Sequence, residues 1–339
     1  VKQQQHQGIY RLPAAIDIYT REGIRREQVI IDGQEETFVF DMNEAPLLVN
    51  FDADKYLLAQ KTETKPIGQW EYQFAHAPLL ADRYEALKAL GSKSRQLPAD
   101  SLAHFFIKAL ADSSEFIRLT AVNILREGEN PGNYSALTNA MINVSVKDPN
   151  SHVRASAIAW LYINGTDKGY EIFESALSDS SYHVLSMALN VLMNDKRFTS
   201  DTQSLIQKLK EHEDARGSNV VLTLSRIYSK YGDSTNGDYF HRAPRYLGHH
   251  EIFYFLIYYE TFLKRQSAEF IYNERFFIKT LEEHTPQDGN QWAYQNLLLQ
   301  LGNHLERSKK TEPGALTEDQ WNELFTLLRP EKTTPAATD

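Results

Sequence analysis

Two adjacent histidines, His249 and His250, are the residues whose types first suggest a metal site. Imidazole and carboxylate groups are ordinary ligands of zinc and other transition metals. Neighbouring side chains point to different sides of a helix or strand, so the two rings would need further ligands, such as His241 and Asp238, to share one ion. We therefore expect a structural role at the start of a helix, with a metal site as the alternative.

Two arginines, Arg118 and Arg154, occupy matching positions in a repeated phrase, each at the same spacing after an aspartate. A planar guanidinium binds a carboxylate through two parallel hydrogen bonds. The pattern predicts that these arginines pair with Asp112 and Asp148, within one repeat or between neighbouring repeats. The alternative is that they face a peptide chamber and bind a peptide carboxylate there.

The sequence lacks the phrases that mark common catalytic sites. It contains no cysteine, which excludes thiolate metal sites and a cysteine nucleophile. It also contains no HExxH and no GxSxG phrase, which mark zinc peptidases and serine hydrolases. We expect no catalytic residue and no bound cofactor in this segment. The net charge of −9 argues against a nucleic-acid-binding protein, which needs a basic face.

One phrase occurs three times, at residues 112–125, 148–161 and 179–192. Each copy has an aspartate or serine that could cap a helix, followed by apolar residues at helical spacing. A single pair of helices cannot bury its own apolar face, so copies must stack and share a core. The repeats therefore predict an irregular solenoid of HEAT type.

Later segments are also predicted to be helical. Residues 317–320, Thr-Glu-Asp-Gln, form a capping box that opens a final helix ending at Leu328. Residues 231–247 have the composition of a loop. The apolar run at 252–263 is too short to cross a bilayer, which takes roughly 20 residues, so we expect no membrane span and a helix buried on most sides.

The first 62 residues have the pattern of β-strands. Residues 14–19 alternate between two faces, and Asp32-Gly33 is a hairpin signal in which glycine would allow a positive φ. Further strands are predicted at 37–41, 47–51 and 56–59. Several short strands separated by turns are typical of a small antiparallel β-sandwich.

The predicted fold class is α+β with several domains, mainly α. A β-sandwich at 1–62 precedes an irregular HEAT-like α-superhelical domain at 63–312. A final helix at 313–329 packs on that domain, and residues 330–339 form a flexible tail. Because the first residue is valine and the opening already looks like a strand, we expect a segment of a longer polypeptide.

The stretch ETFVFDMNEAPLLVNFDADKYLLAQ, residues 36–60, resembles the β-sandwich that follows the catalytic domain in aminopeptidase N-like zinc enzymes, the gluzincin aminopeptidases. The opening strands, with Pro13, are similar to the first strands of that sandwich. The helices would then match the C-terminal α-domain of the family. The family's zinc motif is absent here, so the resemblance carries no catalytic or metal residue onto this sequence.

The resemblance implies a non-catalytic C-terminal region that caps an active-site cleft and restricts access to short peptides. Its partners would be its own upstream catalytic domain and peptide substrates, and the intact parent would be a zinc metallo-aminopeptidase. The alternatives are a free-standing HEAT-like scaffold for protein–protein interaction, and a non-catalytic peptidase relative that acts as an assembly platform. The compartment stays open; for a soluble bacterial chain we expect the cytoplasm or the periplasm.

Overall fold

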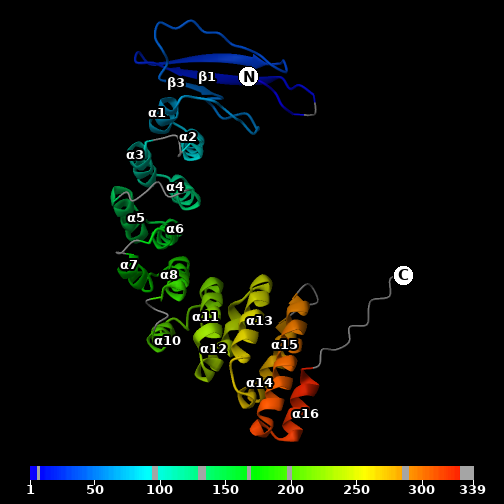
Figure 1. The fold of residues 1–339 in the computed structure, drawn as a ribbon. Helices are drawn as coiled ribbons and strands as arrows, with labels where there is room; N and C mark the ends of the chain where they lie inside the picture. Colours follow the sequence, from blue (N-terminus) through cyan, green and yellow to red (C-terminus); the bar gives the residue numbers. More distant parts are fainter. Residues whose placement is uncertain are drawn as a thin grey trace, which may run out of the picture. The chain divides into compact units, whose positions relative to one another are not determined.

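The computed structural model describes residues 1–5, 8–93, 98–128, 135–165, 169–196, 201–284 and 290–328. It is mainly helical, with a small antiparallel sheet near the N-terminus (Figure 1). The chain forms two compact units, of which unit 1 is Val1–Gly169 and unit 2 is Tyr170–Asp339. The predicted tail at 330–339 lies outside the described residues.

Unit 1 begins with a sheet of three strands, β1 (Leu12–Tyr19), β2 (Ile24–Ile31) and β3 (Leu48–Phe51). The order is β2-β1-β3, and both neighbours run antiparallel to β1. A tight turn joins β1 to β2, in which the N–H of Thr20 donates to the carbonyl of Gly23 (2.9 Å). Gly23 has φ +139°, a value that L side chains rarely adopt, so the positive φ expected at Gly33 occurs here instead.

The two-sheet sandwich is not found among the described residues of 1–62. Segments 37–41 and 56–59 are irregular, although both were predicted to be strands. Their apolar side chains nevertheless cover one face of the sheet, where the packed residues are Phe38, Phe40, Met42 and Leu57. The alternation at 37–41 therefore indicated correctly that Phe38 and Phe40 lie on one face, but the backbone of neither segment forms a strand.

The opposite face of the sheet is partly covered by the first helix. Tyr19 and Leu48 pack with Tyr72 and Ala77, and the rings of Tyr19 and Tyr72 meet edge to face at 6.0 Å. Strand β1 is therefore buried on both faces, from Ala14 to Tyr19, although its alternating pattern is typical of a half-buried strand.

The helices of unit 1 stack in two rows. They are α1 (Ile67–His76), α2 (Leu80–Ser92), α3 (Ala99–Leu110), α4 (Glu115–Glu127), α5 (Ser135–Lys147) and α6 (Ser151–Ile163). In one row α2 packs on α4 and α4 on α6, and in the other α3 packs on α5 (Figure 1). Helices α3 and α4, and α5 and α6, also pack as pairs.

The apolar positions shared by the three repeats are buried, as predicted. The second helices of the repeats are α4, α6 and, in unit 2, α8 (Tyr182–Asn194). Each buries a β-branched residue, an alanine and a leucine at matching positions, none more than 5% exposed: Ile117, Ala121, Leu125, Val153, Ala157, Leu161, Val184, Ala188 and Leu192. The stacking of helix pairs is thus observed, whereas assignment to the HEAT type remains a prediction.

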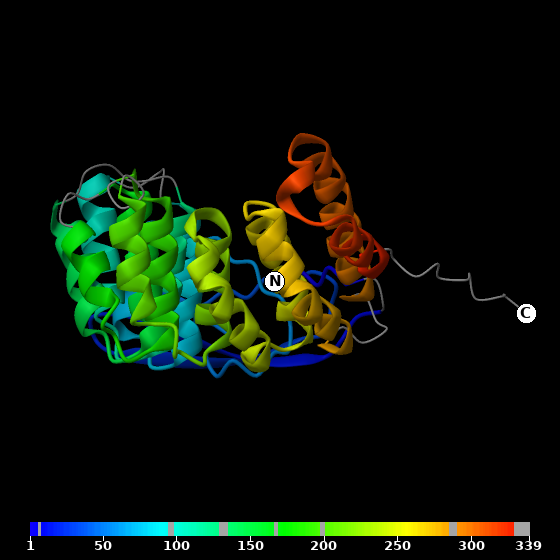
Figure 2. The same ribbon diagram turned by 90° about the horizontal axis from the view of Figure 1, so that it is seen from below.

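Unit 2 continues with paired helices. Besides α8 they include α10 (Thr202–Lys210), α11 (Ser218–Tyr231), α13 (His249–Leu263), α14 (Ala268–Thr280), α15 (Asn290–Thr311) and α16 (Glu318–Leu327). Helix α7 (Gly169–Ala176) begins at the last residue of unit 1. Helices α8, α11, α13 and α15 each pack on the next, and α16 packs on α14 (Figures 1 and 2).

The predicted loop at 231–247 is wrong. It contains the 3-10 turns η2 (Ser234–Asn236) and η3 (Ala243–Tyr246) and, between them, helix α12 (Gly237–Arg242). The side chain of Asp233 caps η2, and two aromatic residues of α12 are buried. The Gly, Asn and Pro content thus indicated the turns but not the short helix.

The capping box predicted at residues 317–320 is confirmed. Thr317 accepts from the N–H of Gln320 (3.3 Å), and the Gln320 side chain accepts from the N–H of Thr317 (2.9 Å), which is the expected capping box. None of the helices that the structure describes is long and apolar enough to cross a membrane.

Candidate functional site

Each repeat contains the same aspartate turn before its second helix. The carboxylates of Asp112, Asp148 and Asp179 each accept from the N–H two residues later, at 2.8, 2.9 and 2.8 Å. The residues at the helix N-caps are Ser114, Asn150 and Ser181. The aspartate therefore orients the capping residue. Of the two candidates that the sequence offered, an aspartate or a serine, the serine occupies the N-cap in the first and third repeats.

Arg118 joins two neighbouring repeats of unit 1. Its Nε and Nη2 donate to the two oxygens of Asp148 at 2.7 and 3.0 Å, and its Nη1 donates to the carbonyl of Asp112 at 2.8 Å. The hydrogen bond to Asp148 raises the pKa of Arg118, partly offset by burial. Because its side chain is only 10% exposed and most of its N–H donors are used, little of Arg118 is left for a peptide ligand.

A related ion pair occurs one repeat earlier, and part of the Arg118 arrangement recurs one repeat later. Arg83 on α2 pairs with the carboxylate of Asp112 at 2.9 Å. Arg154 on α6 repeats the local part of the arrangement, with Nη1 donating to the carbonyl of Asp148 at 2.8 Å. A role of Arg154 toward a peptide stays a prediction. The carboxylate of Asp112 thus binds Arg83 and the turn before α4, and the carboxylate of Asp148 binds Arg118 and the turn before α6.

The structure places His249 and His250 at the exposed start of α13. Within the described part of the chain, no group of three or more His, Asp or Glu side chains is arranged to hold a metal ion. The described residues therefore do not fit a zinc site, and we derive no step through a metal from them.

A buried ionic network, which the sequence did not indicate, joins the sheet to the helices of unit 1. Asp82 on α2 is fully buried. Its Oδ1 accepts from Lys55 Nζ (2.8 Å) and from the Asn50 amide on β3 (3.0 Å). Lys55 also contacts Glu85 (3.1 Å). Burial lowers the pKa of Lys55, but the hydrogen bonds and charges of Asp82 and Glu85 outweigh it, so the pKa is raised.

Two further lysines extend this network along the irregular segment between β3 and α1. Lys61 pairs with Glu63 (2.6 Å) and Glu85 (3.1 Å), and Lys65 pairs with Glu63 (2.9 Å). The Lys65 side chain is only 6% exposed, and burial lowers its pKa despite the charge of Glu63. Three lysines and three carboxylates thus balance in charge, and the contacts with Glu85 hold the segment against α2.

A second buried group connects α12, α13 and α14 in unit 2. Glu274 is 8% exposed and accepts from the hydroxyl of fully buried Tyr259 at 2.5 Å. The same oxygen lies 2.6 Å from Nε2 of His241. The hydrogen bond with Glu274 raises the pKa of His241, although burial lowers it. A half-exposed imidazole thus reaches a buried carboxylate.

We expect this contact to weaken as the pH rises. A histidine whose pKa is raised on folding contributes stability that is fully present below its unfolded pKa of 6.5 and is lost as the pH rises through its folded pKa. Amide hydrogen exchange in α12 and α14 should therefore be slower at about pH 6 than at about pH 8, after correction for intrinsic rates.

The matched variant is His241→Asn, which should abolish this difference. Replacing His212 serves as the control. Burial lowers the pKa of His212, so its contribution to stability changes with pH in the opposite direction to that of His241. An unchanged pH difference in His241→Asn would contradict the assignment.

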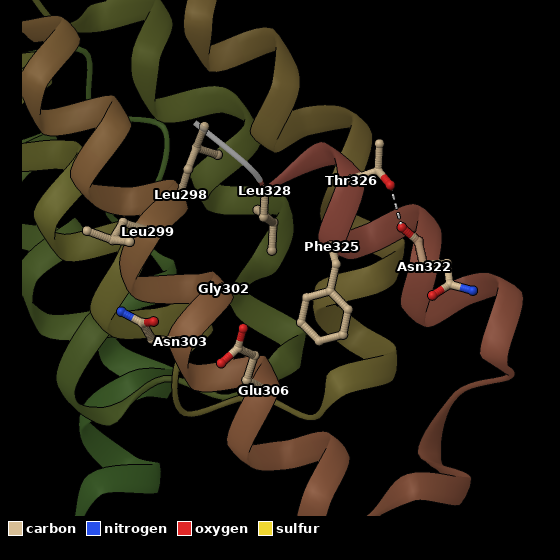
Figure 3. A pocket seen from close by; sticks show the side chains of 9 residues that line it. All are labelled: Leu298, Leu299, Gly302, Asn303, Glu306, Asn322, Phe325, Thr326 and Leu328. Atoms are coloured by element: carbon tan, nitrogen blue, oxygen red, sulfur yellow. Dashed lines mark hydrogen bonds between the residues drawn. The ribbon is translucent and has the colours of Figure 1, made fainter. Parts of the chain in front are cut away.

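A groove of about 480 Å³ lies between α15 and α16 (Figure 3). Its lining combines apolar and polar side chains: Leu298, Leu299, Asn303, Glu306, Asn322, Phe325, Thr326 and Leu328, with Gly302. In the close-up, Phe325 points from α16 into the space that Glu306 of α15 borders. Such a lining suits an apolar side chain with a polar end.

Helices α13 and α15 also carry a set of exposed and half-buried apolar side chains that we call the aromatic surface: Phe253, Tyr254, Ile257 and Trp292. Trp292 is 65% exposed and Tyr254 is 52% exposed. The rings of Trp292 and Phe253 stack at 6.2 Å, and Phe253 meets Tyr254 at 5.4 Å, so the surface is continuous. Exposed apolar patches of this kind mark interaction sites more often than scattered residues do.

The aromatic surface is only partly what the sequence predicts. The run at 252–263 was expected to be buried on most sides, and Phe255 and Tyr259 are indeed fully buried. Tyr254 and Ile257, which lie on the other side of the helix, are exposed. When a helix is apolar on all sides, the spacing of its apolar residues does not show which side faces the solvent.

Comparison with known proteins gives similarities to solved structures. No known family profile and no curated protein matches the sequence. Among solved structures, the chain is similar to Legionella pneumophila aminopeptidase A, crystallised in complex with aspartic acid, at 11% identity and a TM-score of 0.42. The match covers 94% of this chain and 45% of that one, so this chain spans less than half the length of that aminopeptidase.

Proposed function

We propose that this chain is the non-catalytic C-terminal region of an aminopeptidase N-like zinc peptidase. The similarity of residues 36–60 to the sandwich of that family supports the proposal, as does the order of a β module before stacked helices. In this proposal the zinc and its ligands belong to an upstream catalytic domain. The helical region covers the cleft of that domain and restricts entry to short peptides by steric exclusion.

The aromatic surface is the observation that carries this proposal. A tryptophan that is 65% exposed beside a half-exposed tyrosine is costly to leave in water and is typical of the centre of an interface. Contact with a second domain would remove both side chains from water. The surface fits equally a separate protein bound to a scaffold, so the experiment must distinguish the two.

The first part of the test measures the native polypeptide that contains this segment. We expect a chain of more than about twice 39.0 kDa that holds zinc and releases N-terminal residues from peptides. A native chain near 39.0 kDa without zinc would contradict the proposal and favour the free-standing scaffold. A long chain without zinc would favour the assembly platform.

The second part tests the surface in the same intact polypeptide. We expect Trp292→Asp to reduce the preference for short over long peptides by about tenfold in the ratio of kcat/KM values, because a charge there weakens the covering contact. The control is Phe276→Asp on α14, which is 64% exposed but lies outside the aromatic surface. Equal effects of the two variants would count against this surface.

A further inference from the structure

Strand β2 forms an edge of the sheet, and the hydrogen bonds define which of its groups point outward. In an antiparallel pair, alternate residues bond to the partner, and the residues between them direct N–H and C=O away. The bond from Thr20 to Gly23 sets this alternation. With the register of the two strands, this bond directs the backbone N–H and C=O groups of alternate β2 residues away from β1. These residues are Ile24, Arg26, Gln28 and Ile30.

Other bonds of the sheet agree with this assignment. Leu47 donates to the carbonyl of Tyr19 (2.8 Å) and Ala53 donates to that of Ala15 (2.9 Å). The odd-numbered residues of β1 therefore bond on the β3 side, and the even-numbered ones bond to β2. Pro13, which has no N–H, falls in the odd-numbered set, and β2 is unaffected by it.

Among the residues that the structure describes, nothing pairs with the outer backbone groups of β2. The apolar side chains beside them are also open, since Ile24 is 61% exposed and Ile30 is 45% exposed. An eight-residue edge with free N–H and C=O groups is a template for another strand.

Charged side chains commonly protect such an edge, but here they bond within the unit. Arg26 binds both oxygens of Asp17 at 2.6 and 2.8 Å and reaches Asp54 at 3.0 Å. Arg25 binds Glu27 at 2.6 Å. These bonds hold both guanidinium groups against their own unit.

We propose that β2 pairs with β2 of a second copy of this chain, antiparallel about a two-fold axis through Glu27. In this register Ile24 lies beside Ile30 of the second copy, and Arg26 lies beside Gln28. Apolar residues therefore meet apolar ones at both ends, and a cation meets an amide between them.

The charges at the axis are compatible with this register. The two Glu27 side chains lie opposite each other, but each already binds Arg25 of its own strand, and Arg25 of the other copy is the diagonal neighbour. A shift of two residues in either direction would place Ile30 beside Glu22 or Arg26 of the second copy. Only the proposed register matches both isoleucines.

The paired edge is short, so we expect a weak dimer with a Kd of roughly micromolar to several hundred micromolar. Sedimentation equilibrium of the full chain measures it. Gln28→Pro removes one outward N–H without removing a bond to β1, and it should weaken the dimer by at least about tenfold. Gln28→Thr keeps the N–H and should leave the Kd within about twofold.

Single cysteines test the register, because the chain has no cysteine of its own. Glu27→Cys places two thiols at a closely spaced pair, roughly 4.5 Å between Cα atoms, and should form a disulfide-linked dimer faster than Arg25→Cys. Should circular dichroism show that Gln28→Pro is misfolded, Ile24→Lys combined with Ile30→Lys replaces it. A wild-type chain that stays monomeric at about 1 mM, or faster linkage at Arg25→Cys, overturns the proposal.

Discussion

Replacing Arg118 by leucine should lower the free energy of unfolding of unit 1 by roughly 3–5 kcal/mol, the usual cost of breaking a buried ion pair. The Asp148 side chain is only 3% exposed, so without Arg118 its carboxylate stays buried with an unbalanced charge. The carbonyl of Asp112 loses a donor as well. Amide hydrogen exchange in α4 and α6, together with urea unfolding, measures the loss.

Arg126→Leu is the matched control, since it makes the same substitution on the same helix. Arg126 is 33% exposed and its distance to Glu127 is 4.0 Å, so we expect a loss below about 1 kcal/mol. Adding Asp148→Asn to Arg118→Leu should recover part of the stability, because the unpaired charge disappears. Similar losses in the two single variants would show that the buried link contributes little.

Replacing Asp82 by alanine should cost about 3 kcal/mol or more, because Lys55 and Asn50 both lose their buried partner. Lys55 keeps Glu85 (3.1 Å) and the side-chain oxygen of Asn50 (3.1 Å), but its side chain is only 13% exposed, so the ammonium group cannot recover full hydration. We expect faster hydrogen exchange in β3 and α2 together, since the network joins these two elements. The measurement is hydrogen exchange alongside thermal unfolding.

Two further variants test whether the loss comes from the buried charges of the network. Glu71→Ala on α1 removes an exposed carboxylate and should change stability by less than about 0.5 kcal/mol. Lys55→Met in the Asp82→Ala background should restore part of the loss, because it removes the unpaired amine. No recovery in this double variant would mean that packing of Asp82, rather than its charge, is what the network requires.

The features that could be predicted from the sequence depend on the spacing of residues close together in the chain. The buried positions of the repeats follow from helical periodicity, and the capping box at Thr317 depends on residues three apart. The partner of Arg118 was predicted only as a choice between Asp112 and Asp148. The structure uses both, one through its carbonyl and the other through its carboxylate.

The elements that sequence missed depend on contacts between distant segments. Lys55 and Lys65 lie in a stretch with no regular structure, and only the position of α2 and of Glu63 makes them buried cations. The strand predicted at 37–41 fails for a related reason. An alternating pattern identifies which side chains face a core, but pairing of the backbone needs a neighbour that periodicity cannot specify.

The arginine links give the helical array a property that concerns its length rather than its stability. A stretch from Asp112 to the residue before Asp148 contains one aspartate for the arginine upstream and one arginine for the aspartate downstream. Such a stretch therefore carries one charge of each sign. Loss or duplication of a whole stretch during evolution would remove or add one aspartate together with one arginine and leave no buried charge without a partner, whereas loss of a part that contains only one of the two would.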